Sequence, residues 1–77
     1  MTNLKRLRDE ARMTQQELAN AAGLSITHIG YLERGQRRNP SVSTVRAIAR
    51  ALAERTGRPV AEVLAELMGE EVVGYSN

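Results

Sequence analysis

Residues 14–35 read TQQELANAAGLSITHIGYLERG, and this stretch decides the fold. Its apolar residues recur at the three- and four-residue spacing of an α-helix, first up to Gly23 and then again up to Gly35. Glycine is common directly after a helix, where the chain turns into a left-handed conformation. The stretch therefore predicts two short helices joined by a turn of three or four residues, which makes a tight corner and not a hairpin.

Capping residues fix where both helices begin. Thr14 and Glu17 have the spacing of a capping box, in which each side chain accepts a hydrogen bond from a backbone N–H group at the start of a helix. Ser25 supplies an N-cap two residues after the first glycine. We therefore expect one helix to begin at Gln15 and the next to span about residues 26–34.

Helical spacing continues outside this stretch, and the sequence shows no period-two alternation of useful length. Apolar residues predict further helices over about residues 4–12, 43–56 and 59–68. Residues 1–69 are therefore expected to form a single all-α domain, a compact bundle of five helices with a helix-turn-helix over residues 15–34. Residues 70–77 are expected to form a C-terminal tail.

Composition excludes several classes of protein. The 77 residues include no cysteine and a single histidine, so the chain offers no disulfide framework, no thiolate zinc site and no histidine metal cluster. The apolar runs are too short for a transmembrane helix or a secretory signal. The sequence contains no plausible catalytic triad, no carboxylate pair in a recognisable pocket motif and no phosphate-binding glycine loop. Neither an enzyme, a cofactor nor a small-molecule ligand is predicted.

Charge is divided unevenly along the chain. Residues 1–58 hold all eleven basic residues and five of the nine acidic residues, which gives this part a net charge of +6. Residues 59–77 hold the other four acidic residues and no base, a net charge of −4. Ten of the eleven bases are arginine, whose planar guanidinium suits phosphate groups and guanine edges better than lysine does. The N-terminal part is therefore expected to meet an anion.

The predicted corner has the layout of a helix-turn-helix reader, in which the second helix enters the major groove of DNA. Ala19 is small where the two helices must cross, and Ile29 and Leu32 can close that crossing from the second helix. The residues that the second helix then presents to the outside are Ile26, Thr27, His28, Gly30, Tyr31 and Arg34. Double-stranded DNA is the partner that this arrangement predicts.

Residues 7–52, LRDEARMTQQELANAAGLSITHIGYLERGQRRNPSVSTVRAIARAL, resemble the XRE-type regulators, a family that includes the Cro and repressor proteins of lambda-like phages. The resemblance extends more loosely to about Met68. The polar landmarks that recur together with the apolar ones are Gln15, Glu17, Gly23, Ser25, Glu33, Gly35 and Pro40. The resemblance implies a bundle of five helices that binds operator DNA, usually as a dimer.

The resemblance also implies roles for individual residues. Gln15 would anchor a phosphate at the N-terminus of its helix, where backbone N–H groups also favour an anion. Ile26, Thr27 and Tyr31 fall where the family reads bases.

Further residues fall at flanking positions. His28 and Arg34 lie where family members touch sugar or phosphate. Arg37 and Arg38 follow in a loop where family members contact the DNA backbone or a minor groove, and the alternative for them is a solvated charge pair. The full set expected at the DNA interface is Gln15, Gln16, Ser25, Ile26, Thr27, His28, Tyr31, Arg34, Arg37 and Arg38.

Two features depart from the best-known readers. Ile26 and Thr27 replace amide side chains that can bond adenine bidentately, so Ile26 offers only apolar contact, for example to a thymine methyl group. Gly30, expected to be exposed in the middle of a helix, costs about 1 kcal/mol relative to alanine. It either allows close approach to DNA or is simply tolerated. Base readout is then expected to depend more on Tyr31, on phosphate contacts and on DNA shape.

Three charged residues also have a structural interpretation. Glu33 beside DNA would repel phosphate, so we expect it to pair with an arginine or a backbone donor. Arg46 and Arg50 share a face of the predicted fourth helix, and they either flank DNA or pair with acids such as Glu54.

The acidic C-terminal segment carries an apolar stripe, which is the expected contact between two subunits. Part of the stripe must close the monomer core, with Val60, Leu64 and Leu67 as candidates. The residues expected at the homodimer interface are Val63, Leu67, Met68, Val72 and Val73.

Two functions remain open on the sequence alone. The first is a sequence-specific transcriptional regulator, a homodimeric repressor or control protein that binds a pseudo-palindromic operator and is cytoplasmic, at the nucleoid. The second is an antitoxin or adaptor whose helix-turn-helix scaffold mainly binds a protein partner. The arginines near Gly35 favour the first, and the apolar acidic tail permits the second.

Overall fold

The computed structural model describes residue 1, residues 3–35 and residues 40–69. Within these residues the chain forms five α-helices and no strand. The helices are α1 (Asn3–Glu10), α2 (Gln15–Ala22), α3 (Ile26–Glu33), α4 (Val42–Thr56) and α5 (Val60–Leu67). The predicted all-α bundle of five helices is confirmed, whereas the expected tail over residues 70–77 lies outside the described residues. None of the described helices is long and apolar enough to cross a lipid bilayer.

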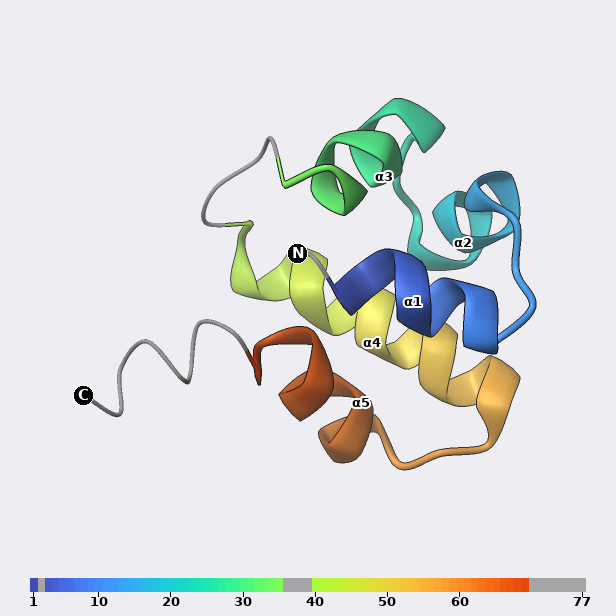
Figure 1. Cartoon of the computed structure of the whole chain (residues 1–77), viewed down its shortest axis with the longest axis vertical. Helices are drawn as coiled ribbons and strands as arrows, with labels where there is room; N and C mark the ends of the chain where they lie inside the picture. The colour runs from blue at the N-terminus through green and yellow to red at the C-terminus, as the bar shows by residue number, and fades with distance from the viewer. Residues whose placement is uncertain (2, 36–39, 70–77) are drawn as a thin grey trace.

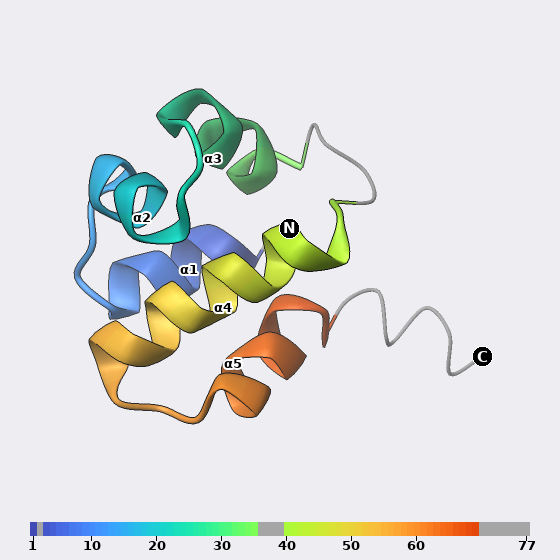
Figure 2. The same cartoon turned by 180° about the vertical axis from the view of Figure 1, so that it is seen from behind.

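The helices are arranged in three tiers, which Figures 1 and 2 show from opposite sides. α1 and α4 run through the middle of the molecule, α2 and α3 lie on one side of them, and α5 lies on the other. α4, the longest helix at 15 residues, packs against α2 and α5, and α1 packs against α3 and α5. The α2–α3 pair is therefore held at one edge of the molecule, away from α5.

One apolar core joins the three tiers. Its largest fully buried side chains come from all five helices and are Leu4, Leu18, Ile29, Leu32, Ile48, Leu52, Val63 and Leu67. Burying one aliphatic side chain of this size stabilises a fold by about 1.5–3 kcal/mol. Helices of eight residues are not stable alone in water, so this packing is what maintains α2 and α3. Ile29 and Leu32 are both 0% exposed, which confirms the inward face predicted for the third helix.

Hydrogen bonds at the helix starts confirm the predicted caps. The Thr14 hydroxyl accepts from the Glu17 N–H at 3.0 Å, and the Glu17 carboxylate accepts from the Thr14 N–H at 2.9 Å, which completes the capping box. The Ser25 hydroxyl accepts from the His28 N–H at 3.0 Å. Both helices of the corner therefore begin at the residues that the sequence predicted.

Several other boundaries differ by one or two residues from those expected, and two of these differences have a visible cause. α1 ends at Glu10, two residues early, because Arg12 adopts a left-handed conformation with a φ of 57°. α4 begins one residue early, because the Ser41 hydroxyl caps it by accepting from the Thr44 N–H at 3.1 Å. Both differences arise at helix ends, where a single residue decides whether the chain continues to coil.

Polar contacts centred on Glu66 join α5 to α1. The Asn3 side-chain amide donates to the Glu66 carbonyl at 2.7 Å, and the Arg6 guanidinium lies 3.7 Å from the Glu66 carboxylate. Arg58 also binds that carboxylate and pairs with Glu62 at 2.6 Å. Hydrogen bonds to Glu66 and Glu62 raise the pKa of Arg58. These contacts fix α5 on the side of the molecule opposite the α2–α3 pair.

Candidate nucleic-acid interface

The corner between α2 and α3 is closed by backbone geometry. Gly23 takes the left-handed conformation with a φ of 70°, and the Leu24 N–H donates to the Ala19 carbonyl at 2.9 Å. Ala19 itself is 0% exposed, so no larger side chain fits there without moving the helices apart. The predicted helix-turn-helix corner is confirmed.

α3 exposes a ridge of side chains on the face away from the core. Ile26 and Tyr31 are each 42% exposed, and Ser25, Thr27 and Arg34 are also exposed. Thr27, Tyr31 and Arg34 follow at intervals of four and three residues, so they form one line along the helix. The outward orientation predicted for Ile26, Thr27, Tyr31 and Arg34 is confirmed. Contact with DNA stays a prediction.

Gly30 is not part of this exposed ridge. It is buried, so the expectation of an exposed glycine is wrong. The Arg34 side chain covers it, because a Cβ built on Gly30 would lie 3.3 Å from Arg34 Nη1. Long helical side chains lean toward the N-terminus of their helix, which brings Arg34 over the residue four positions earlier. His28, another residue expected on the outside, is half-buried.

Arg34 also contacts Tyr31. Its guanidinium carbon lies 5.4 Å from the centroid of the Tyr31 ring, within the range of a cation–π interaction. The sequence predicted both residues on the outer face of the helix but did not predict this contact. Its only signal in the sequence is an aromatic residue three positions before an arginine on one helix.

Gln15 and Gln16, the other predicted contacts near the corner, form the first turn of α2. The Gln15 amide donates to the Glu33 carboxylate at 2.9 Å, and the Gln16 amide donates to Asn20 at 2.9 Å. An amide group has two N–H donors, so each glutamine keeps one for a further acceptor. The backbone N–H groups of both residues have no acceptor among the described residues, as is usual in the first turn of a helix.

A buried ion pair supports this helix start. Arg8 donates from Nε to Glu33 Oε2 at 2.5 Å and from Nη2 to Oε1 at 3.2 Å, and its Nη1 donates to the Met13 carbonyl at 2.8 Å. The side chains of Arg8 and Glu33 are only 11% and 4% exposed. The hydrogen bond to Glu33 raises the pKa of Arg8, against the effect of burial. The structural role predicted for Glu33 is confirmed.

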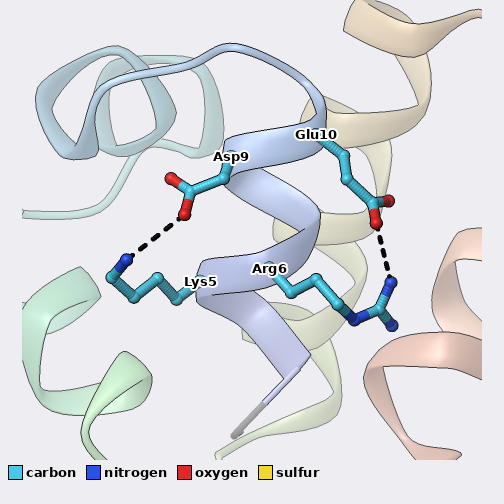
Figure 3. A pocket seen from close by; sticks show the side chains of 4 residues that line it. All are labelled: Lys5, Arg6, Asp9 and Glu10. Carbon is cyan, nitrogen blue, oxygen red and sulfur yellow. Dashed lines mark hydrogen bonds and ion pairs between the residues drawn. The ribbon is translucent and has the colours of Figure 1, made fainter.

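The remaining bases near the N-terminus lie at the surface of α1. Lys5 pairs with Asp9 at 3.2 Å, and Arg6 pairs with Glu10 at 3.0 Å. These four residues line an open hollow of the surface (Figure 3). Side chains in both pairs are more than half exposed, so each pair contributes little to stability. No group of three potential metal-ligating residues is found in the part of the chain that the structure describes.

The other predicted basic contacts are placed only in part. Arg46 and Arg50 are exposed on α4 and make no ion pair with any described residue, Glu54 included. Arg37 and Arg38 lie outside the described residues.

Two residues of α5 that we expected at a subunit interface are buried instead. Val63 and Leu67 are 1% and 2% exposed and belong to the monomer core, so their assignment to a homodimer interface is wrong. The packing of α5 against α4 decides which edge of the apolar stripe faces inward. Val72 and Val73 lie outside the described residues.

The exposed edge of that stripe contains other apolar residues. Val60 is 41% exposed and Met68 is 40% exposed, and Leu64 between them is half-buried. A mostly apolar groove of about 150 Å³ lies between α4 and α5. It is lined by Pro40, Val42, Val45, Arg46, Leu64 and Met68.

Comparison with known proteins agrees with this geometry. The sequence profile of the helix-turn-helix family matches residues 4–57, from α1 to the end of α4. The immunity repressor protein of Bacillus phage phi105 is 38% identical over 74 residues, which cover 96% of this chain and 49% of that protein. An uncharacterized HTH-type transcriptional regulator of Sinorhizobium fredii, y4dJ, is 45% identical over 51 residues, which cover 66% of this chain and 65% of that protein. No solved structure matches the chain significantly.

The chain spans about half the length of the phage repressor and just under two thirds of the bacterial regulator. The family profile covers well over half of this chain, including the whole α2–α3 corner, and the family consists of regulators and not of enzymes. The chain therefore belongs to the XRE-type helix-turn-helix family of transcriptional regulators.

Proposed function

We propose that this protein binds specific DNA sequences and regulates transcription as a homodimeric repressor or control protein. The observation that carries the proposal is the exposed ridge of α3, held outward by a corner that is closed on the core side. Membership of a family of regulators supports it, and the relative named an immunity repressor favours repression. Such a protein acts in the cytoplasm, at the nucleoid.

In this proposal α3 enters the major groove, which accepts a single helix. The N-terminal part of such a helix meets base edges. Thr27 and Tyr31 carry hydroxyl groups that donate to or accept from those edges, and Ile26 makes apolar contact with a thymine methyl group. Ser25 lies at the cap, where its hydroxyl already holds the helix start.

Phosphate contacts would orient α3 in the groove. The first turn of α2 offers the backbone N–H groups of Gln15 and Gln16, and the helix dipole favours an anion there. The contact between Gln15 and Glu33 fixes this turn relative to α3. His28 lies within α3, and Arg34, Arg37 and Arg38 follow this helix in the sequence. We assign all four to the DNA surface.

A homodimer would place two copies of α3 on neighbouring half-sites. One module of this kind buries roughly 600–1,000 Å² on DNA, and joining two modules raises the effective concentration of the second without new contacts. We assign the subunit contact to the exposed side of α5, at Val60, Leu64 and Met68. Half-sites of a pseudo-palindromic operator would then be spaced about 34–36 Å apart.

The groove between α4 and α5 also supports a second candidate function. Its apolar lining is suited to a segment of another protein, as in an antitoxin or an adaptor. Binding to a protein partner predicts no dependence on the exposed residues of α3, which separates the two candidates experimentally.

Selection of binding sites from random duplex DNA, at two salt concentrations, tests the proposed function. We expect the wild-type protein to enrich a pseudo-palindrome with half-sites about one helical turn apart. The double variant Thr27→Ala with Tyr31→Ala should lose most of this enrichment and keep the salt-dependent background, because it removes side chains and no charge.

The variant Ala61→Ser provides the control, because it changes an exposed residue of α5 far from α3. It should enrich the same sequence as the wild type. If the wild type enriches no sequence and its residual binding disappears at moderate salt, α3 does not read DNA and the protein-partner function takes precedence.

A further inference from the structure

Arg34 follows directly after α3, yet its side chain runs back along the helix. Its Nη1 lies 3.3 Å from the point that a Cβ on Gly30 would occupy, and its guanidinium carbon lies 5.4 Å from the centroid of the Tyr31 ring. Gly30 and Tyr31 precede Arg34 by four and three residues, so both are its neighbours on the helix surface. The guanidinium is therefore held on the exposed ridge of α3 and not beyond the end of the helix.

The backbone of Gly30 gives no reason for a glycine at this position. The described glycines with a positive φ are Gly23, Gly35 and Gly57, whereas Gly30 is an ordinary residue of α3. Glycine inside a helix is less stable than alanine. What an alanine would disturb here is the Arg34 guanidinium, which would have to shift by a few tenths of an ångström. Gly30 is therefore best explained as space for the Arg34 side chain.

Tyr31 also restricts the Arg34 guanidinium. A free arginine side chain has many rotamers and loses that freedom when it binds a ligand. Contact with the Tyr31 ring restricts it before DNA arrives, which lowers this cost. Gly30 and Tyr31 therefore hold the Arg34 guanidinium in a restricted position. A restricted guanidinium favours a specific ligand over a loose contact with phosphate.

The chemistry of that ligand follows from the shape of the group. A guanidinium presents two parallel N–H donors that match the O6 and N7 atoms of guanine, and this is the commonest specific contact in the major groove. Arg34 lies on the same line along the helix as Thr27 and Tyr31. The base that Arg34 contacts would therefore come next to the bases that Thr27 and Tyr31 contact. We propose that Arg34 reads a guanine in each half-site and that Gly30 and Tyr31 position its guanidinium.

This inference rests on the proposed function, DNA recognition by α3, and it names one base of the recognised sequence. Site selection on random DNA with the wild type, Arg34→Lys and Gly30→Ala tests it. Arg34→Lys keeps the charge for a phosphate but loses the planar fork. We expect it to lower the preference for one guanine per half-site by about fivefold or more, and to leave the slope of affinity against salt unchanged.

Gly30→Ala should lower the preference for the same guanine, because the methyl group displaces the guanidinium. The variant should nevertheless unfold at the same temperature as the wild type or at a higher one, since alanine favours the helix. If Gly30 had only a structural role, its replacement would not lower the guanine preference while the unfolding temperature stays the same or rises. Gly69→Ala is the matched control, because its Cβ would meet only Asn3, at an ordinary 3.9 Å, and it should leave the guanine preference unchanged.

Each outcome distinguishes the inference from the function on which it rests. A wild type that enriches no sequence would overturn both. A wild-type sequence that Arg34→Lys leaves unchanged would overturn the inference and leave the proposed function standing. Loss of the guanine with Arg34→Lys but not with Gly30→Ala would overturn the positioning role of Gly30.

Discussion

At the scale of single residues, one carboxylate joins three helices around the corner. Glu33 on α3 accepts from Arg8 on α1 and from Gln15 on α2, and Arg8 also donates to the Met13 carbonyl. Removing one partner of a buried ion pair leaves the other charge without compensation, which costs about 3–5 kcal/mol in proteins. The relative positions of α1, α2 and α3 therefore depend on this group.

We expect Arg8→Met and Glu33→Leu each to lower the free energy of unfolding by about 3 kcal/mol. The double variant should lose less than the sum, because no unpaired charge remains. Urea unfolding of the wild type, the two single variants and the double variant measures how far the two losses depart from additivity. Glu10→Gln is the control, because Glu10 pairs with the exposed Arg6, and this change should cost less than about 0.5 kcal/mol. If the double variant loses as much stability as the two single variants together, Arg8 and Glu33 do not stabilise each other.

Contacts between individual side chains were the least predictable part of the candidate site. The repulsion expected between an acid and DNA was enough to predict that Glu33 pairs with an arginine or a backbone donor. It was not enough to identify Arg8, which is 25 positions away and meets Glu33 only after α1 has packed on α3. Gly30 was expected on the outside because helical position alone cannot show that Arg34 folds back over it.

At the scale of elements, α2 is held at its start by a pH-dependent cap. The backbone N–H of Thr14 donates to the Glu17 carboxylate, and this hydrogen bond lowers the pKa of Glu17. A lowered pKa in the folded state means that the cap stabilises the protein above the usual glutamate pKa, about 4.3. That contribution is lost as the pH falls through the lowered value.

The variant Glu17→Gln should therefore lose less stability than the wild type between pH 7 and pH 3. Urea midpoints at the two pH values measure the difference. Glu54→Gln provides the control, since Glu54 is exposed and has no partner among the described residues, and it should leave the pH dependence unchanged. An equal loss in wild type and Glu17→Gln would show that the capping carboxylate does not respond to pH.

The end of α1 offers a stabilising change. Arg12 has a φ of 57°, a conformation that costs a residue with a Cβ about 1 kcal/mol and glycine nothing. Arg12→Gly should raise the melting temperature by several degrees for a domain of this size. Arg12→Ala removes the same charge but keeps the Cβ, so it should give no increase. A rise with both variants would trace the effect to charge and not to the backbone.

The first residues of α2 and α3 could be predicted from the sequence, because the residues that cap these helices lie close to them in the chain. Thr14, Glu17, Ser25 and Gly23 act within four residues of the helix ends that they define. The burial of Val63 was not predictable in this way. An amphipathic stripe covers a broad arc of a helix, and only the packing of α5 on α4 selects which edge faces the core.

At the scale of the whole molecule, the α2–α3 corner and the exposed side of α5 belong to opposite tiers. This separation allows two copies to meet through α5 while each presents α3. Val60→Asp with Met68→Asp should reduce a dimer to a monomer in sedimentation and preserve the helical circular dichroism, because both residues are about 40% exposed. Asn20→Asp adds a charge on α2 and should leave the mass unchanged. An unchanged mass in the double variant would place the subunit contact elsewhere.

The proposed reading of bases by α3 can be examined from the DNA side. The measurement is the affinity for the selected operator after single-atom or single-group changes in the DNA. Uracil in place of thymine and 7-deazaguanine in place of guanine alter the major groove, whereas hypoxanthine in place of guanine removes a group from the minor groove. We predict that the first two changes weaken binding within each half-site and that the third does not. Binding that is sensitive only to the minor-groove change would show that α3 does not read bases from the major groove.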